Sequence, residues 1–252
     1  MLPSNSTTND KLAKCMSKIK NYIELLRINH WFKNIVTLLG SFYALYQIKA
    51  EVQLSTLLLA TIAFLLTCLL SSVNYIINQI VDVPTDLHHP VKKNRPLPCG
   101  IIPVRQAKFI TVSLLVFTTT ISLLFLNFKV ILWLYSFLVA GMIYNIKPIR
   151  LKDISILDVI SESVNNPIRF LIGWFAISVS YYPSFLLLLT LWSSGAVLMS
   201  YKRLRELKSL DTTIAQKYRL SFKFYTPRRL LMISIFWVFI TIALLCVYAY
   251  QQ

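Results

Sequence analysis

Residues 54–100 of this chain read LSTLLLATIAFLLTCLLSSVNYIINQIVDVPTDLHHPVKKNRPLPCG. The first part, 54–81, is a long apolar run that exceeds the roughly 20 residues an α-helix needs to cross a bilayer. Within it, polar residues begin to recur at every fourth position, so they share one face of a helix; they are Asn74, Asn78, Asp82 and Asp86. The stretch therefore predicts a membrane-spanning helix that ends in a stripe of amide and carboxylate oxygens.

The composition of the whole chain agrees with a membrane protein. Of its 252 residues, 56% are hydrophobic and only 14% are charged, whereas soluble domains average about 45–50% apolar and about 25% charged. The apolar residues cluster into runs long enough for membrane spans, at 31–48, 54–81, 106–126, 129–147, 154–179, 183–200 and 229–250. We predict an all-α fold, a polytopic transmembrane helix bundle of about seven spans.

The net charge of +16 follows the predicted topology. Basic residues gather in the N-terminal arm and after the second, fourth and sixth runs, whereas the opposite loops offer only Lys49 and Lys129. By the positive-inside rule, the N-terminus and the basic loops are cytoplasmic. We therefore expect a multi-pass protein of the cell inner membrane that contacts membrane lipids, and we expect no nucleic acid as a partner.

Two regions follow from these patterns. Residues 1–30 form a cytoplasmic N-terminal arm, in which 12–26 have the spacing of an amphipathic helix on the membrane surface. Residues 31–252 form a single transmembrane domain. No cleavable signal peptide is expected, because residues 1–10 are polar.

The carboxylates at the end of the second run are candidates for a metal site. Mg²⁺ takes one or two carboxylates and completes its shell with water and phosphate oxygens, which fits Asp82 and Asp86 with Asn78 nearby. The alternative is a solvated helix end with two ordinary carboxylates. The polar stripe reaches back into an apolar helix, where unsatisfied amides are costly, and this favours a cavity.

The loop after this helix is rich in basic residues and in proline. His89, Lys92 and Arg95 stand between Pro90 and Pro96, which restrict the loop. We predict that His89, Lys92 and Arg95 contact phosphate groups, and that the histidine is not part of a zinc site, because it lacks partners at zinc spacing.

A second polar stripe lies in the fifth run. Asp158, Glu162, Asn165 and Arg169 fall within about 60° of one another on a continuous helix. Ionisable groups inside a span are expensive and usually functional, so we predict substrate contacts here. The alternative is a structural Glu162–Arg169 pair. Pro167 is expected to kink this helix.

A third cluster follows the sixth run. Lys202, Arg203 and Glu206 are expected at the cytoplasmic membrane edge, with Asp211 slightly farther out. The alternative is that they are flanking charges, with Lys202 and Glu206 forming an ordinary helix salt bridge. On the same side as the first stripe, the cluster would complete a pocket.

These segments together resemble the UbiA superfamily of intramembrane prenyltransferases. The pattern Asn78-x₃-Asp82-x₃-Asp86, followed by His89-Pro90-x-Lys92-Lys93-x-Arg95-Pro96, resembles its first signature. The segment YNIKPIRLKD at 144–153 looks like its cytosolic YxxxPxRLK segment. The resemblance covers roughly residues 22–230 and implies the superfamily's fold, which usually has up to nine helices.

Two further features are similar to the branch that makes polyprenyl-phosphoryl phosphoribose, the decaprenylphosphoryl-5-phosphoribose synthase-like enzymes. They are Arg27-x₃-Trp31-x-Lys33-Asn34 and Lys202-Arg203-x₂-Glu206. A basic pair in the second motif suits a donor with more phosphate charge, such as phosphoribosyl diphosphate. The resemblance implies that residues 31–252 are a catalytic domain with its site on the cytoplasmic side, Mg²⁺ as cofactor, and a polyprenyl chain in a lipid-facing tunnel.

The resemblance and the residue chemistry together assign roles. The predicted catalytic and metal-binding residues are Asn78, Asp82, Asp86 and Glu206. The predicted substrate-binding residues, which contact phosphates, sugar or lipid phosphate, are Lys33, His89, Lys92, Arg95, Tyr144, Lys152, Asp158, Glu162, Arg169, Lys202 and Arg203.

Three functions are compatible with these features. The first is Mg²⁺-dependent transfer of 5-phosphoribosyl from phosphoribosyl diphosphate to polyprenyl phosphate. The second is prenyl transfer from a polyprenyl diphosphate to an aromatic or other acceptor. The third is a transporter, which usually shows repeat symmetry and helices broken at matching positions; the sequence shows no such repeat. We predict the first.

Overall fold

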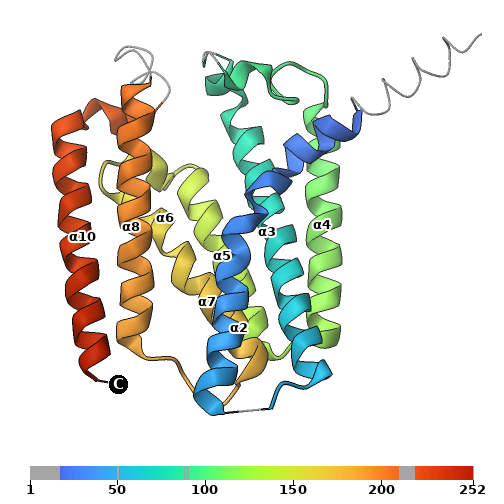
Figure 1. Cartoon of the computed structure of the whole chain (residues 1–252). Helices are drawn as coiled ribbons and strands as arrows, with labels where there is room; N and C mark the ends of the chain where they lie inside the picture. Colours follow the sequence, from blue (N-terminus) through green and yellow to red (C-terminus); the bar gives the residue numbers. More distant parts are fainter. Residues whose placement is uncertain (1–17, 50, 88, 90, 210–218, 252) are drawn as a thin grey trace, which may run out of the picture.

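The computed structural model describes residues 18–49, 51–87, 89, 91–209 and 219–251. These residues form helices and connecting turns without any β-strand, which confirms the predicted all-α class (Figure 1). The longer helices are α2 (Ile35–Ile48), α3 (Leu54–Asp86), α4 (Val104–Phe125), α5 (Phe128–Asn145), α6 (Leu157–Ser163), α7 (Asn165–Ile177), α8 (Phe185–Lys208) and α10 (Pro227–Tyr250). Four short 3₁₀ turns connect them, η1 (Ile28–Asn34), η2 (Lys92–Asn94), η3 (Leu151–Asp153) and η4 (Leu220–Lys223).

Each of the seven predicted spans overlaps one or two of these helices, but α2, with 14 residues, and the pair α6 and α7 are not among the described helices that are long and apolar enough to cross a membrane. Helices α3, α4, α5, α8 and α10 are long and apolar enough to cross a membrane, and α3 continues past 81 to Asp86, so both carboxylates lie on the helix itself. The predicted span 154–179 is broken at Val164 into α6 and α7. Pro167 lies in the first turn of α7, where its missing N–H has no partner to lose, so the break precedes it.

The start of the chain follows the predicted amphipathic helix in part. Residues 18–26 are helical, while 12–17 lie outside the described residues. Ile19 and Ile23 are exposed, as expected for a face turned to the membrane surface. Leu25, which the amphipathic pattern leaves off the apolar face, is fully buried in a cluster with Ile76 at the end of the bundle.

The connections alternate between the two ends of the bundle, as Figure 1 shows. The segments that contain η2, η3 and η4 meet at one end of the bundle. Lys152 of η3 contacts Asp82 of α3, Lys92 of η2 contacts Glu206 of α8, and η4 contacts η3. The predicted basic loops therefore share one end of the molecule. Whether this end faces the cytoplasm stays a prediction.

Helix α7 lies at the centre of the bundle and packs against α2, α3 and α5. Its backbone approaches α2 closely, since a Cβ on Gly173 would lie 1.7 Å from the carbonyl oxygen of Thr37 and one on Gly40 would lie 2.1 Å from that of Phe170. Small residues at such crossings are common in membrane helix pairs.

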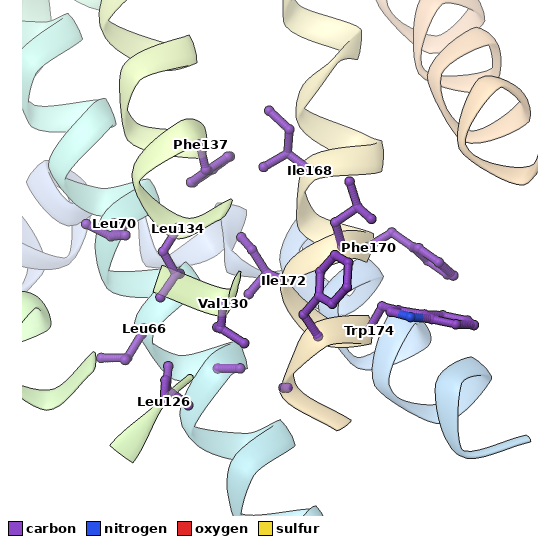
Figure 2. Close-up of a cluster of buried hydrophobic side chains, with 14 of the residues drawn as sticks. Leu66, Leu70, Leu126, Val130, Leu134, Phe137, Ile168, Phe170, Ile172 and Trp174 are labelled. Carbon is purple, nitrogen blue, oxygen red and sulfur yellow. The ribbon is translucent and has the colours of Figure 1, made fainter. Parts of the chain in front are cut away.

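The largest apolar cluster fills the half of the bundle away from the basic loops. It joins Leu66 and Leu70 of α3, Val130 and Leu134 of α5, and Ile172 of α7 (Figure 2). Because these side chains occupy that half, the space between the helices is open to polar groups only toward the basic end.

Candidate functional site

A cavity of about 290 Å³ opens among the helices at the basic end of the bundle. Nine basic side chains and three carboxylates line it. The charged lining residues are Arg27, Lys33, Lys92, Arg95, Lys152, Arg169, Lys202, Arg203, Arg219, Asp82, Glu162 and Glu206. The uncharged lining includes His30, Asn74, Tyr75, Asn78, Tyr144, Asn145 and Asn165. The surplus of positive charge makes the cavity a site for anions.

The α3 stripe reaches the cavity as far as Asp82. Asn74, Asn78 and Asp82 line it, one helical turn apart, as the spacing predicted. Asp86 does not line it: its side chain is fully buried, and its Oδ2 accepts a hydrogen bond from Arg95 Nη1 at 2.9 Å. The other oxygen, Asp86 Oδ1, is buried and has no hydrogen-bond partner among the residues that the structure describes.

Asp82 is neutralised by two cations from the loop between α5 and α6. Lys152 Nζ lies 2.6 Å from Asp82 Oδ1 and 2.8 Å from Oδ2, and it also donates to Asn78 Oδ1 at 2.9 Å. Arg150 Nη2 donates to Asp82 Oδ1 at 3.0 Å and is itself tethered to Asp153. Burial lowers the pKa of Lys152 to about 8, although Asp82 pulls the pKa upward.

The end of α8 contributes the predicted third cluster. Arg203 Nη1 donates to Glu206 Oε2 at 3.0 Å, and Lys92 Nζ lies 3.7 Å from Glu206 Oε1. Burial lowers the pKa of Lys92 to about 8, against the opposing attraction of Glu206. Lys202, Arg203 and Glu206 all line the cavity, while Asp211 lies outside the described residues.

Asp158 lies behind the cavity wall and does not line it. Its side chain is fully buried and accepts hydrogen bonds from Arg203 Nε at 2.8 Å and from the Tyr225 hydroxyl at 2.6 Å. Arg219 Nη1 is 3.6 Å away. The predicted substrate contact of Asp158 is therefore replaced in this structure by contacts to two arginines of the cavity.

The rest of the second stripe does reach the cavity. Glu162, Asn165 and Arg169 line it, although the helix is broken between the first two. Arg169 does not follow the alternative of a Glu162–Arg169 pair, since its Nε donates to Asn34 Oδ1 at 2.8 Å. Its guanidinium lies 4.8 Å from the centre of the Phe137 ring.

His89 is a turn residue rather than a cavity residue. Its Nδ1 accepts hydrogen bonds from the backbone N–H groups of Val91 and Lys92 at 3.1 and 3.2 Å. Burial and the nearby Lys92 lower its pKa to about 4, which favours the neutral ring. The histidine thereby shapes the loop that presents Lys92 and Arg95.

The residue assignments made from the sequence omit several cavity residues. Arg27 Nη2 lies 2.6 Å from His30 Nε2, and its guanidinium is 4.9 Å from the Tyr75 ring centre. Burial and Arg27 lower the pKa of His30 to about 4. Arg219 reaches the cavity from the segment before α10, and its Nη1 donates to the Tyr144 hydroxyl at 3.2 Å. The motif with Arg27 was visible in the sequence, whereas nothing local signalled Arg219.

The donor set fits a hard cation only in part. Among the described residues, no three His, Cys, Asp or Glu side chains converge as a metal cluster, and the carboxylates of Asp82, Asp86 and Glu206 each have a Lys or Arg partner. The oxygens that do converge are those of Asn78 and Asp82, around Lys152. Such oxygen donors suit Mg²⁺, and the unpartnered Asp86 Oδ1 is a further one close by in the helix.

The fold and the cavity define an integral membrane protein with a polar, strongly basic chamber inside a helical bundle. Comparison with known proteins identifies it further. The chain matches the UbiA prenyltransferase family over residues 34–252 and belongs to that family. This confirms the resemblance inferred from the motifs and the expectation of a transferase.

Relatives and solved structures agree with this assignment. The chain is 29% identical to a decaprenyl-phosphate phosphoribosyltransferase of Corynebacterium glutamicum, over 81% of this chain and 60% of the relative. It is 28% identical to the enzyme of the same name from Mycolicibacterium smegmatis, over 82% of this chain and 63% of the relative. A UbiA homolog from Archaeoglobus fulgidus, bound to GPP and Mg²⁺, superposes with a TM-score of 0.75 at 20% identity, over 92% of this chain and 78% of that one. The chain thus spans about three-fifths of the length of these curated relatives.

Proposed function

We propose that this protein transfers 5-phosphoribosyl from phosphoribosyl diphosphate to polyprenyl phosphate at the cytoplasmic side of the cell inner membrane. One observation carries the proposal, namely the nine basic side chains against three carboxylates in one cavity. The donor brings a diphosphate and a 5-phosphate, and the acceptor brings a third phosphorylated group. Prenyl transfer to an aromatic acceptor would place one diphosphate, and at most one carboxylate, among these cations.

The names of the relatives support the same substrate class. Both curated relatives are decaprenyl-phosphate phosphoribosyltransferases, and the match covers most of this chain. The chain spans about three-fifths of their length, and we propose the same activity for it.

The reaction needs little covalent participation from the protein. An oxygen of the polyprenyl phosphate attacks C1 of the ribose, the new C1–O bond forms, and the bond from C1 to diphosphate breaks, with its electron pair leaving on the diphosphate. The attacking phosphate is already ionised at neutral pH, so the step requires no general base. The residues of this chain contribute by holding the two anions in line and by stabilising the leaving charge.

Individual residues have distinct parts in this proposal. Lys92 and Arg95 from the loop after α3 and Arg219 from the segment before α10 would bind phosphates, the arginines bidentately. Lys33 and Arg169, which also line the cavity, would hold the lipid phosphate or the sugar. Lys202 adds charge, and Glu162 and Tyr144 offer oxygen atoms to hydroxyl groups.

Mg²⁺ is the proposed cofactor. Asn78 and Asp82, with Asp86 and Glu206 directly or through water, would hold it. When bound it would neutralise the leaving diphosphate. Arg203 is less suited to bind phosphate, because Asp158, Glu206 and Tyr144 already accept hydrogen bonds from its three nitrogens.

The second candidate is prenyl transfer from a polyprenyl diphosphate to an aromatic or other acceptor. The observation in its favour is the fold shared with a UbiA homolog that was solved with GPP and Mg²⁺. Both reactions release diphosphate, so the stripe of Asn78, Asp82 and Asp86 could bind Mg²⁺ and the diphosphate in either reaction.

A two-donor assay separates these candidates. The protein is expressed in a host that lacks both activities, and its membranes receive Mg²⁺ with either ribose-labelled phosphoribosyl diphosphate and polyprenyl phosphate, or labelled polyprenyl diphosphate and an aromatic acid. We expect labelled lipid from the first mixture, and none from the first mixture with an Asp82→Asn variant expressed at the same level. A product from the second mixture alone would replace the proposal by prenyl transfer.

A further inference from the structure

The ammonium group of Lys152 is surrounded by side-chain oxygen atoms beside the cavity. Its Nζ lies 2.6 and 2.8 Å from the two carboxylate oxygens of Asp82, 2.9 Å from Asn78 Oδ1 and 3.4 Å from Asn145 Oδ1. The oxygen atoms that accept these hydrogen bonds belong to α3 and α5, and the lysine belongs to η3. Lys152 is only 4% exposed, so water does little to solvate its charge.

This group of oxygen atoms has the chemistry of a cation site. All of its donors are oxygens, one group carries a full negative charge, and two separate helices hold them in place. Divalent Mg²⁺ and Mn²⁺ favour such carboxylate and amide oxygens. The Lys152 ammonium therefore contacts the same oxygen atoms that a metal ion bound to Asn78 and Asp82 would use as ligands.

Moving the Lys152 ammonium away from Asp82 costs free energy. If Lys152 withdrew while remaining in the protein, it would be a buried cation without its carboxylate, which is strongly unfavourable. Around the cavity the other nearby charges are mostly basic, with Arg150 directly on Asp82 and Arg219 also lining the cavity. The withdrawn ammonium therefore needs a new anion, and a phosphate group in the cavity supplies one.

We infer that the Lys152 ammonium occupies the cation site formed by Asn78 and Asp82. A divalent ion binds tightly at this site only when a diphosphate binds with it. A divalent ion alone must displace Lys152 without offering it a partner. A divalent ion that arrives with diphosphate replaces Lys152 at Asp82 and gives the ammonium a phosphate to contact. The inference rests on the part of the proposed function that puts Mg²⁺ at Asp82, and it does not depend on which group is transferred.

Equilibrium dialysis of the full chain in phosphatidylcholine nanodiscs tests this inference without any turnover. The probes are Mn²⁺ alone and Mn²⁺ with inorganic pyrophosphate, with empty nanodiscs as blank. We expect the wild type to bind Mn²⁺ alone weakly and to bind it at least about tenfold more tightly with pyrophosphate. Equal affinity under the two conditions overturns the inference, and this arm needs no variant.

The Lys152→Met variant provides the second arm. It should bind Mn²⁺ alone at least about tenfold more tightly than the wild type, because Asp82 then loses its closest cation. Lys147→Met is the matched control, since it removes an exposed positive charge from the same loop and should leave the affinity unchanged. If Lys152→Met gains no affinity, or if Lys147→Met gains as much, the inference is wrong.

A double variant locates the metal. In Asp82→Asn/Lys152→Met the gain over the wild type should disappear, whereas its persistence would mean that the metal binds elsewhere and that Lys152 is not its competitor. These readings separate the inference from the proposed function. Protein that shows the exchange but makes no labelled lipid refutes only the transfer, and protein that makes the lipid without the exchange refutes only the inference.

Discussion

Asp82 and Asp158 are both buried carboxylates that contact lysine or arginine, yet they lie in different environments. Asp82 lines the cavity, and its closest partner is a lysine on a loop. Asp158 is fully enclosed, and its partners are the Nε of a buried arginine and the hydroxyl of Tyr225. Lysine is a mobile point charge, whereas arginine makes directed contacts in a plane.

In the proposed function this difference makes Asp82 part of the reactive centre and Asp158 a support for it. At Asp82, which lines the cavity, the inferred exchange has a divalent cation replace Lys152. At Asp158, the contacts fix Arg203, which in turn holds Glu206 and Tyr144 at the cavity wall. Burial of an ionisable group in a membrane protein thus does not by itself indicate contact with substrate. The partners of the group and its access to the cavity decide which role it has.

The largest expected effect comes from Asp82→Asn, which keeps the size of the side chain and removes its charge. We expect transfer activity to fall by about 10⁴-fold, or about 5.5 kcal/mol, because the cation site loses its charged ligand. The measurement is kcat in nanodiscs, with the thermal unfolding midpoint as control for folding. Activity within tenfold of the wild type would remove Asp82 from the reactive centre.

Asp158→Ala should act on stability in the first place. It leaves Arg203 buried without its carboxylate, which costs about 3–5 kcal/mol. Chemical unfolding in detergent measures this loss. Replacing both partners, as in Asp158→Leu/Arg203→Met, should recover much of it, because no buried charge is then left unpaired. A stable Asp158→Ala variant that has lost activity would instead make Asp158 a second reactive carboxylate.

Arg219→Lys should have an intermediate effect that distinguishes binding from folding. Arg219 connects Asp158 and Tyr144 with the cavity, and a lysine keeps the charge without the planar contacts. We expect KM for phosphoribosyl diphosphate to rise about tenfold, or about 1.4 kcal/mol, with little change in stability. Lys223→Arg, at an exposed position on η4, is the control with no expected effect. An unchanged KM would exclude Arg219 from donor binding.

Tyr225→Phe should have the smallest effect on substrate binding in the series. It removes one hydroxyl that donates to Asp158 Oδ1 and accepts from the backbone N–H of Ile156 at 2.6 Å. The expected loss is about 1–3 kcal/mol of stability with unchanged KM values. A change in KM larger than that of Arg219→Lys would show that the Asp158 centre takes part in substrate binding directly.

In each of the two stripes three of the four predicted side chains line the cavity, and the fourth, Asp86 or Asp158, does not. Helix α3 is continuous to Asp86, so the spacing of four residues placed Asn74, Asn78 and Asp82 correctly in the cavity. The second stripe assumed one continuous helix, but the chain breaks at Val164, and Asp158 turns into the protein interior. Asn165 and Arg169 nevertheless line the cavity beyond the break, whereas Asp86, on the unbroken α3, is buried against Arg95. Periodicity thus predicted the shared face, and contacts with other segments decide which side chains reach the cavity.

Other parts of the site depend on contacts between distant segments. The charge of Arg203 was evident from the sequence, but its engagement by Asp158 and Tyr144 requires α5, α6 and α8 to meet. The same holds for Arg219, which no local motif indicates. Lys152 was predicted as a substrate-binding residue from its motif, and only the structure reveals its position on Asp82.

The most direct test of the proposed function follows two phosphates of one donor. Phosphoribosyl diphosphate is labelled either at the 5-phosphate or at the terminal phosphate of the diphosphate, and the purified protein receives it with Mg²⁺ and polyprenyl phosphate. Phosphoribosyl transfer predicts that the lipid product carries the 5-phosphate label and that the terminal label is released as diphosphate. Phosphoribosyl transfer would be contradicted by a lipid that carries the terminal label, or by wild-type protein that yields no labelled lipid from either labelled form of the donor.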